Sequence, residues 1–251
     1  MQEPFQIHFS SGSTAIAVQP TAISELETAL HILGFQESQP VIVVIGGASE
    51  LQHHHLTRLR TLFVKVLAPL AETWNAVVVD GGTDAGVMRM MGTARRKIRA
   101  AFPLVGVLPI GMATLPNSLP PAADAAPLEP HHTHFVLVPG TQCGDESIWI
   151  AQTASAIANG FPTVTVLING GEVTWKDAAE SVDAGRPIVV IGGSGRAADA
   201  LVAALNGKVT DGRAKKLLAS GLLRAVNLEN DSGLVDAVQT ILAGQTSPEF
   251  P

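Results

Sequence analysis

Short, continuously apolar runs recur along the chain, separated by longer segments of mixed polarity. Most of these runs do not alternate apolar with polar residues, which is typical of strands that are buried on both faces of a parallel sheet. Arg224–Asn227 is a candidate for a further strand. The expected strands are Val41–Ile45, Ala76–Asp80, Leu104–Pro109, His134–Val138, Thr163–Ile168 and Pro187–Ile191.

The segments between these runs carry apolar residues at helical spacing, as Leu59, Leu62 and Val66 illustrate. The N-terminal residues 5–9 and 14–18 are expected to form a small hairpin. Strands that alternate with helices predict a doubly wound, mainly parallel α/β sheet with helices on both faces. The expected helices are Thr21–Leu33, Leu56–Thr73, Val87–Ala101, Glu146–Asn159, Lys176–Ala184, Ala197–Leu205 and Leu234–Ala243.

One segment, Ile110–His132, has neither period and contains five prolines: Pro116, Pro120, Pro121, Pro127 and Pro130. A connection of this length in a compact α/β fold usually marks a binding loop, so we expect it to cover a ligand. The 251 residues fit a single α/β domain, expected over residues 1–245 with a tail at 246–251, two smaller domains being the alternative.

Composition narrows the class of protein. The net charge is −6 with no strongly basic stretch, so a nucleic acid is not an expected partner. No apolar run reaches the roughly 20 residues that cross a bilayer, and no secretory signal is visible, so we expect a cytoplasmic protein without membrane contact. The single cysteine, Cys143, excludes a disulfide framework and a cysteine-based zinc site.

Four of the expected strands run into glycine-containing turns, and each turn precedes a helix. In a parallel sheet such turns meet at the carboxyl edge, where backbone N–H groups and helix N-termini suit an anion. Strand-to-helix turns also favour glycine for geometry alone. The candidate ligand-binding residues are Gly46, Gly47, Ala48 and Ser49, then Gly81, Gly82, Thr83 and Gly86, then Gly140 and Thr141, and finally Gly193, Ser194, Gly195 and Arg196.

No standard phosphate motif or nucleophile elbow occurs: G-x-G-x-x-G, G-x-x-x-x-G-K-[ST] and G-x-S-x-G are all absent. Three longer segments are more specific. They are VVVDGGTDAGV at 77–87, LEPHHTHFVLV at 128–138 and PIVVIGGSGRAAD at 187–199. In this order they resemble segments of the cytosolic N-terminal region of melastatin-type TRP channels. The chain is identified as a stand-alone, prokaryotic-type member of the SLOG superfamily, in the branch (LSDAT) shared with these channels.

The resemblance implies a Rossmann-like fold that binds a nucleotide-derived ligand such as ADP-ribose, an NAD-related molecule or an AMP-like nucleotide. It calls for no other cofactor, and it allows a homo-oligomer. From the residues themselves we expect no metal. A ligand-sensing role is the first interpretation. The alternatives are a nucleotide-processing hydrolase and a protein-interaction subunit whose glycine turns no longer bind ligand.

The hydrolase alternative depends on a carboxylate. The Lonely Guy phosphoribohydrolases of the same superfamily carry a glutamate after the glycines of their "PGG-x-GT-x-x-E" turn, whereas Met88 and Met90 occupy this part of the present chain. Because a carboxylate stabilises an oxocarbenium-like centre or activates water, its absence argues against hydrolysis at this turn. Glu146 is the candidate acid–base residue if the protein is an enzyme, with Asp84 as the other option.

Several side chains have two interpretations. Arg196 suits a phosphate or pairs with an acid, and Asp199 is expected to orient it or to cap the turn. Thr83 is a ligand contact or a helix cap. His134 bonds to backbone or reaches the ligand, and with His132 it offers only two metal ligands where a third is lacking. The basic cluster Arg95, Arg96, Lys97 and Arg99 is interpreted as a solvated helix end or an oligomer contact.

Overall fold

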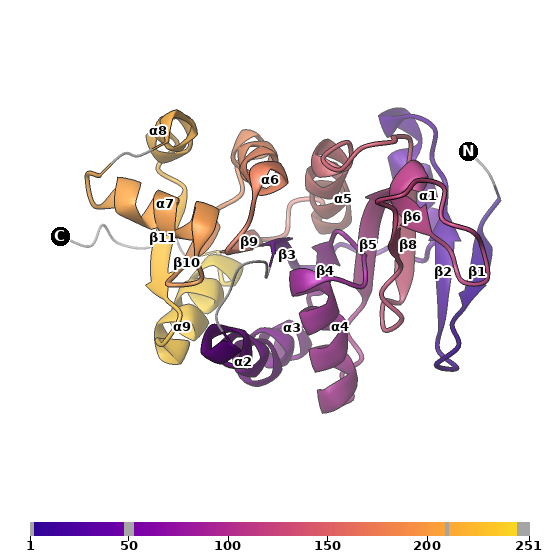
Figure 1. Ribbon diagram of the computed structural model, residues 1–251, viewed down its shortest axis with the longest axis horizontal. Coiled ribbons are helices and arrows are strands. Elements are labelled where there is room, and N and C mark those ends of the chain that lie inside the picture. Colours follow the sequence, from indigo (N-terminus) through magenta and orange to yellow (C-terminus); the bar gives the residue numbers. More distant parts are fainter. Residues whose placement is uncertain (1–2, 48–52, 209–210, 245–251) are drawn as a thin grey trace.

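The computed structural model describes residues 3–47, 53–208 and 211–244. Nine of its strands form one sheet in the order β1-β2-β8-β5-β4-β3-β9-β10-β11 (Figure 1). All neighbouring strands are parallel except β1 and β2. The strands are β1 Phe5–His8, β2 Thr14–Val18, β3 Val41–Gly46, β4 Val77–Asp80, β5 Leu104–Pro109, β8 His134–Val138, β9 Thr163–Ile168, β10 Ile188–Gly192 and β11 Leu223–Asn227, with a separate pair, β6 Ala113–Thr114 and β7 Ala126–Pro127.

The sheet confirms the expected doubly wound, mainly parallel architecture, and every strand expected from the sequence is present. A 3-10 turn at Ile23–Glu25 precedes α1, a π-helical turn at Phe63–Leu67 joins α2 to α3, and a 3-10 turn at Ile110–Met112 follows β5. The helices are α1 Leu26–Ile32, α2 His53–Leu62, α3 Ala68–Thr73, α4 Gly86–Ile98, α5 Ser147–Ala158, α6 Glu172–Asp183, α7 Arg196–Leu205, α8 Gly212–Ala219 and α9 Asp231–Leu242.

Helices cover both faces of the sheet. In Figure 1, α1 and α5 to α8 lie on one face, and α2, α3, α4 and α9 lie on the other. Successive residues of a strand point to opposite faces, so Val43 packs in the first layer and Val44 in the second. Both side chains are almost fully buried. The continuous apolar runs are therefore the consequence of a sheet with two buried faces.

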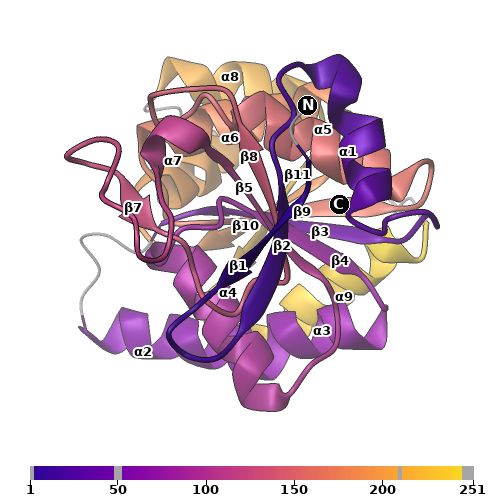
Figure 2. The same ribbon diagram turned by 90° about the vertical axis from the view of Figure 1, so that its right-hand side faces the viewer.

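The N-terminal hairpin extends the same sheet. β2 pairs with β8 in parallel, with Ile16 opposite His134. Figure 2, which looks from the hairpin side, shows the strands fanning out behind it as the sheet twists. The hairpin therefore covers the edge of β8 that would otherwise be unpaired.

The strand order reverses between β3 and β9. From β3 the chain moves outward to β4, β5 and β8, and it then returns to place β9 on the other side of β3. At the carboxyl ends of this central pair, Gly46 lies opposite Ile168. A Cβ atom on Gly46 would lie 1.9 Å from the carbonyl oxygen of Ile168, and its φ is +129°, so glycine is required here. The reversal places a crevice at this edge, where α/β sheets bind ligands.

Candidate functional site

A cavity of about 230 Å³ opens beside this reversal. Its floor is made by the carboxyl ends of three neighbouring strands, its walls by α5 and α6, and its cover by the proline-rich loop between β5 and β8. The strands and the turns after them contribute Val44, Ile45, Gly46, Gly81, Thr83, Leu108 and Pro109. The loop contributes Met112, Asp124 and Ala126. The loop Ile110–His132, which was expected to cover a ligand, therefore lines the cavity with three of its residues.

The structure brings together part of the predicted set. Gly46, Gly81, Thr83 and the alternative acid Glu146 line the cavity. Gly47 follows Gly46 but donates its N–H to the carbonyl of Ile168, at 3.1 Å. Ala48 and Ser49 lie outside the described residues.

In the second turn, Gly82 faces the sheet and not the cavity. Its N–H donates to Asp80 Oδ1 at 2.8 Å, and a Cβ atom on it would lie 2.8 Å from the Cα of Gly106. Gly86 begins α4 and lines a separate groove between α2 and α4. This turn therefore gives the cavity only Gly81 and Thr83.

In the turn after β8, two backbone N–H groups are already bonded to a side chain of the same loop. The backbone N–H of Thr141 donates to Asp145 Oδ2 at 3.0 Å, and that of Gln142 donates to the same oxygen at 3.1 Å. Gly140 approaches the Asp145 side chain so closely that a Cβ atom would lie 2.7 Å from it. Gly140 and Thr141 are thus bonded within their own loop and do not line the cavity.

The turn after β10 is also largely closed. Gly193 donates its N–H to Asp199 Oδ1 at 2.7 Å, which confirms that Asp199 caps the turn. The hydroxyl of Ser194 accepts from the Asn169 N–H at 2.7 Å and donates to the carbonyl of Ile191. Gly195 is the residue before α7, and its φ is +100°. The Gly193–Gly195 turn therefore packs against the turn after β9 instead of opening into the cavity.

The turn after β9 was missed in the sequence. Asn169-Gly170-Gly171 follows Ile168 and leads into α6, which begins at Glu172, four residues before the expected start. Nothing in the described residues caps α6 with a side chain, and its first-turn residues Val173 and Thr174 line the cavity. Arg196 lies beside this turn, because a Cβ atom on Gly171 would be 3.1 Å from its guanidinium Nη2. The glycine pair after an apolar run was the signal that would have found it.

Two acids line the wall that α5 and α6 form. Asp177, on α6, is 8% exposed, and its Oδ1 accepts from the hydroxyl of Ser147 at 2.6 Å. Burial, helped by the nearby charge of Glu146, raises the pKa of Asp177 to about 7. Burial also raises the pKa of Glu146, whose Oε2 accepts from the Gly144 N–H at 2.7 Å. Asp177 can thus hold or release a proton near neutral pH.

The described part of the cavity wall therefore carries acidic groups without basic ones. Asp124, Glu146 and Asp177 supply carboxyl groups and Cys143 a thiol, and the described lining includes no lysine, arginine or histidine. Met88, at the position that argued against hydrolysis, lines the same cavity. An acidic wall suits hydroxyl groups, which donate to carboxylates, and it repels a phosphate.

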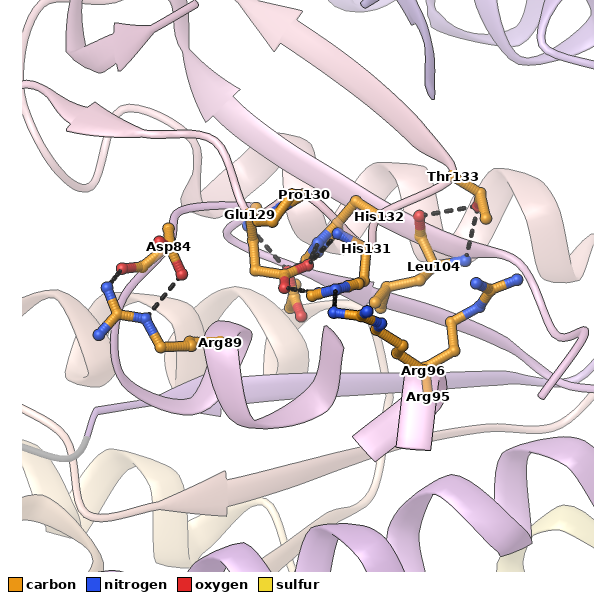
Figure 3. A network of polar contacts seen from close by, with 12 residues as sticks. Asp84, Arg89, Arg95, Arg96, Leu104, Glu129, Pro130, His131, His132 and Thr133 are labelled. Carbon is orange, nitrogen blue, oxygen red and sulfur yellow. Dashed lines mark hydrogen bonds and ion pairs between the residues drawn. The ribbon is translucent and has the colours of Figure 1, made fainter. Parts of the chain in front are cut away.

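His134 lies away from this site, at the amino end of β8, where its ring packs against Phe35 at 4.9 Å between centroids. Burial and the charge of Arg95 lower the pKa of His134 to about 4. Both ring nitrogens of His132 face carboxylates: Nδ1 is 2.8 Å from Glu129 Oε2 (Figure 3), and Nε2 is 2.8 Å from Asp80 Oδ1.

This buried histidine holds the loop before β8 against the second glycine turn. Asp80, Glu129 and His132 are each at most 1% exposed. Burial opposes a charge on His132, but the two carboxylates outweigh it and raise the pKa of His132 to about 9, so an imidazolium donates to both. Since Asp80 also accepts the Gly82 N–H, the network fixes the shape of a turn that borders the cavity.

Gly92, in the middle of α4, makes room for this network. A Cβ atom there would lie 2.0 Å from Glu129 Oε2, inside a buried and fully packed carboxylate. An alanine normally stabilises a helix by about 1 kcal/mol relative to glycine. We expect Gly92→Ala to reverse this sign and to lower the free energy of unfolding by roughly 2–3 kcal/mol, because it displaces Glu129 from His132. Urea denaturation measures the effect.

Gly212→Ala is the matched control for Gly92→Ala. Gly212 is the first residue of α8, and a Cβ atom on it would meet nothing within 4 Å. The control should leave the free energy of unfolding unchanged or raise it slightly. Equal stability of the two variants would contradict the tight packing of Glu129 against α4.

Comparison with known proteins agrees with this architecture. Residues 39–236 match the family described as SLOG in TRPM, prokaryote. The TRPM member-like 2 channel of Nematostella vectensis is 30% identical over 203 residues, which cover 66% of this chain and 13% of the channel. TRPM2 of Mus musculus is 26% identical over 196 residues, or 64% of this chain and 13% of the channel. The chain thus spans about one eighth of the length of these relatives.

A solved structure shares the fold. The X-ray structure of TM1055, a structural genomics target, superposes with a TM-score of 0.54 at 19% sequence identity, covering 80% of this chain and 99% of that one. No helix among the described residues is both long and apolar enough to cross a bilayer. With most of its length matched by the family model, from before β3 to within α9, this chain belongs to the SLOG family of TRPM type, in its prokaryotic branch.

Proposed function

We propose that the protein binds a nucleotide derivative, such as ADP-ribose, an NAD-related molecule or an AMP-like nucleotide, in the cavity at the carboxyl edge of its sheet. The observation that carries the proposal is the position of this cavity at the reversal of strand order, with Gly46, Gly81 and Thr83 on its floor. Membership of a family shared with TRPM channels supports a nucleotide-related ligand.

The charges around the cavity orient the ligand. Its ribose hydroxyls would lie against Glu146 and Asp177, which accept hydrogen bonds and can also donate one when protonated. Its phosphates would lie toward the first turn of α6, where the helix dipole and backbone N–H groups favour an anion. Arg196, beside Gly171, adds positive charge at that end. Anion binding, which the sequence analysis expected of four glycine turns, is thus proposed mainly for the turn after β9.

Ligand-induced stabilisation tests this proposal. NAD, ADP-ribose, cyclic ADP-ribose and AMP are each added to the protein, and the unfolding temperature is followed. A ligand at 100 times its dissociation constant adds about 2.7 kcal/mol to the free energy of unfolding. Asp177→Asn keeps an acceptor for Ser147 but removes the titratable carboxyl, and we expect it to weaken binding roughly tenfold or more.

Asp183→Asn is the matched control, because Asp183 lies on the same helix but is exposed and pairs with Lys216 at 3.4 Å. It should bind like the original protein. An absence of stabilisation by every nucleotide, or an equal effect of the two asparagine variants, would count against the proposed site.

The acidic wall also favours a second candidate function, hydrolysis of an N-glycosidic bond. Glu146 and Asp177 supply the carboxyl groups that the Met88 position lacks. In such a step water adds to the ribose C1′ as the C1′–N bond breaks; one carboxylate takes the proton of the water, and a protonated carboxyl returns a proton to the leaving nitrogen. Chromatography of the same incubations detects the free base. Turnover that Glu146→Gln abolishes would establish hydrolysis, and stabilisation without product would leave a binding protein.

A further inference from the structure

A second cavity, of about 310 Å³, lies at the opposite edge of the sheet. Strands β2, β5 and β8 begin at this amino edge, and α4 ends there. Three arginines from the end of α4, namely Arg95, Arg96 and Arg99, line the cavity together with Ser13, Thr14 and the segment Pro130–Thr133. None of these residues lines the carboxyl-edge cavity.

The charge of this cavity is uncompensated within its described lining, which contains no aspartate or glutamate. The carboxylates whose charges act on Arg95 are Glu72 and Glu129, and neither lines the cavity. Glu72 accepts from the N–H groups of Ala101 and Phe102, and Glu129 is bonded to His131 and His132. A cluster of three like charges in little more than one helical turn is unfavourable, yet it persists in a chain whose net charge is −6. A bound anion would remove this repulsion.

The arginines do not serve to cap α4, which is the ordinary reason for cations at a helix end. The carbonyl of Arg96 accepts the Arg99 N–H at 3.1 Å, and the carbonyl of Arg95 accepts the Ala100 N–H at 3.0 Å. Arg99 itself makes this closure in the left-handed region, at φ +55°. The carbonyls of Arg95 and Arg96 are thus satisfied by backbone, so the end of α4 does not need the guanidinium groups of Arg96 and Arg99 as caps.

Two of the guanidinium groups are held in place by hydrogen bonds, that of Arg96 through His131 as Figure 3 shows. Arg95 is half-buried, its Nε donates to the carbonyl of Phe102 at 2.7 Å, and its guanidinium carbon lies 5.5 Å from the centre of the Phe102 ring. Arg96 Nη1 lies 3.4 Å from His131 Nε2. Because His131 Nδ1 is 2.6 Å from Glu129 Oε1 and donates to it, Nε2 is free to accept from Arg96. Such pre-positioned forks lose little entropy when they bind.

From these observations we infer that the amino-edge cavity is an anion-binding site for a phosphate group, either inorganic phosphate or the phosphate of a small ester. Planar guanidinium forks match the oxygens of a phosphate in pairs, and the hydroxyl of Thr14 lines the same cavity as a further donor. The hydroxyls of Ser13 and Thr133 also line it, but they already donate to the carbonyls of Pro130 and Leu104. The site is separate from the nucleotide site and does not depend on the function proposed above.

The test titrates the protein with inorganic phosphate and, in a parallel series, with glycerol phosphate, each against sodium chloride at equal ionic strength. Isothermal titration calorimetry gives the affinity. The double substitution Arg96→Gln with Arg99→Gln leaves the structural Arg95 intact, and we expect it to weaken phosphate binding at least tenfold. Tighter binding of glycerol phosphate than of inorganic phosphate would identify an ester as the ligand; the reverse order would identify the free ion.

The control is the double substitution Arg60→Gln with Lys65→Gln, which also removes two positive charges but does so in the groove between α2 and α4. It should bind phosphate like the original protein. Phosphate that has no more effect than chloride, that binds the Arg96/Arg99 variant unchanged, or that is lost equally in both double variants would overturn the site. Because nucleotide binding is measured at the other edge of the sheet, with the Asp177→Asn and Asp183→Asn variants, failure of one proposal leaves the other intact.

Discussion

Replacement of His132 by glutamine is expected to lower the free energy of unfolding by roughly 3–5 kcal/mol at neutral pH. The imidazolium of His132 is the partner shared by Asp80 and Glu129, and all three groups are buried. A glutamine amide can donate to one carboxylate but supplies no positive charge, so two buried acids would be left without compensation. Chemical denaturation at pH 7 measures the loss, with His31→Gln, an exposed position on α1, as the control.

The pH dependence of this deficit identifies its cause. The folded state raises the pKa of His132 from 6.5 to about 9, so it binds a proton more tightly than the unfolded state does. The stabilisation is complete below pH 6.5 and is lost as the pH rises through 9. The difference between the original protein and His132→Gln should therefore narrow between pH 7 and pH 10. A difference that stays constant over this range would show that packing, and not charge, explains the loss.

The consequence of this network for the candidate site is indirect. Asp80 accepts the N–H of Gly82, while the neighbours Gly81 and Thr83 line the carboxyl-edge cavity. The backbone carbonyl of Gly82 in turn accepts the Glu129 N–H at 2.9 Å. Within the segment LEPHHTHFVLV, His132 thus holds in place the turn that borders the cavity, whereas His134 lies away from it.

The strands could be predicted because both faces of the sheet are buried, which leaves a continuous apolar run such as that of β3 in the sequence itself. Helices were less certain at their ends. Helix α8 was not predicted, and the early start of α6 was missed because Glu172 and Thr174 interrupt its apolar period. That error left out Val173 and Thr174, the first-turn residues that line the cavity.

The use of the glycine turns could not be predicted from the turns alone. Whether a backbone N–H faces a ligand depends on side chains and carbonyls that pack against it. Asp145 occupies the donors after β8, and Asp199 occupies the Gly193 N–H after β10. Both acids lie within six residues of their turns, but an acid at such a position is equally compatible with a solvated first helical turn. Only the fold decides between these roles.

The second large effect is expected for Gly46→Ala, at the reversal of strand order. The methyl group would lie 1.9 Å from the carbonyl oxygen of Ile168, in the central strand pair, and at φ +129°. The positive φ costs roughly 1–2 kcal/mol, and the overpacking adds roughly 1–3 kcal/mol. The total lowers the free energy of unfolding by about 2–5 kcal/mol, and separation of β3 from β9 would also distort the floor of the carboxyl-edge cavity.

Gly34→Ala separates these two contributions. Gly34 also has a positive φ, +97°, but a Cβ atom on it would meet nothing within 4 Å. Gly34→Ala should show the backbone cost alone and leave nucleotide-induced stabilisation intact. Gly46→Ala should show both the backbone cost and the overpacking cost, and it should lose the nucleotide-induced stabilisation. If the two alanine variants unfolded at the same denaturant concentration, the close contact between Gly46 and Ile168 would not be the reason for glycine there. The reversal point would then owe its shape to backbone conformation, and the floor of the cavity would tolerate a side chain.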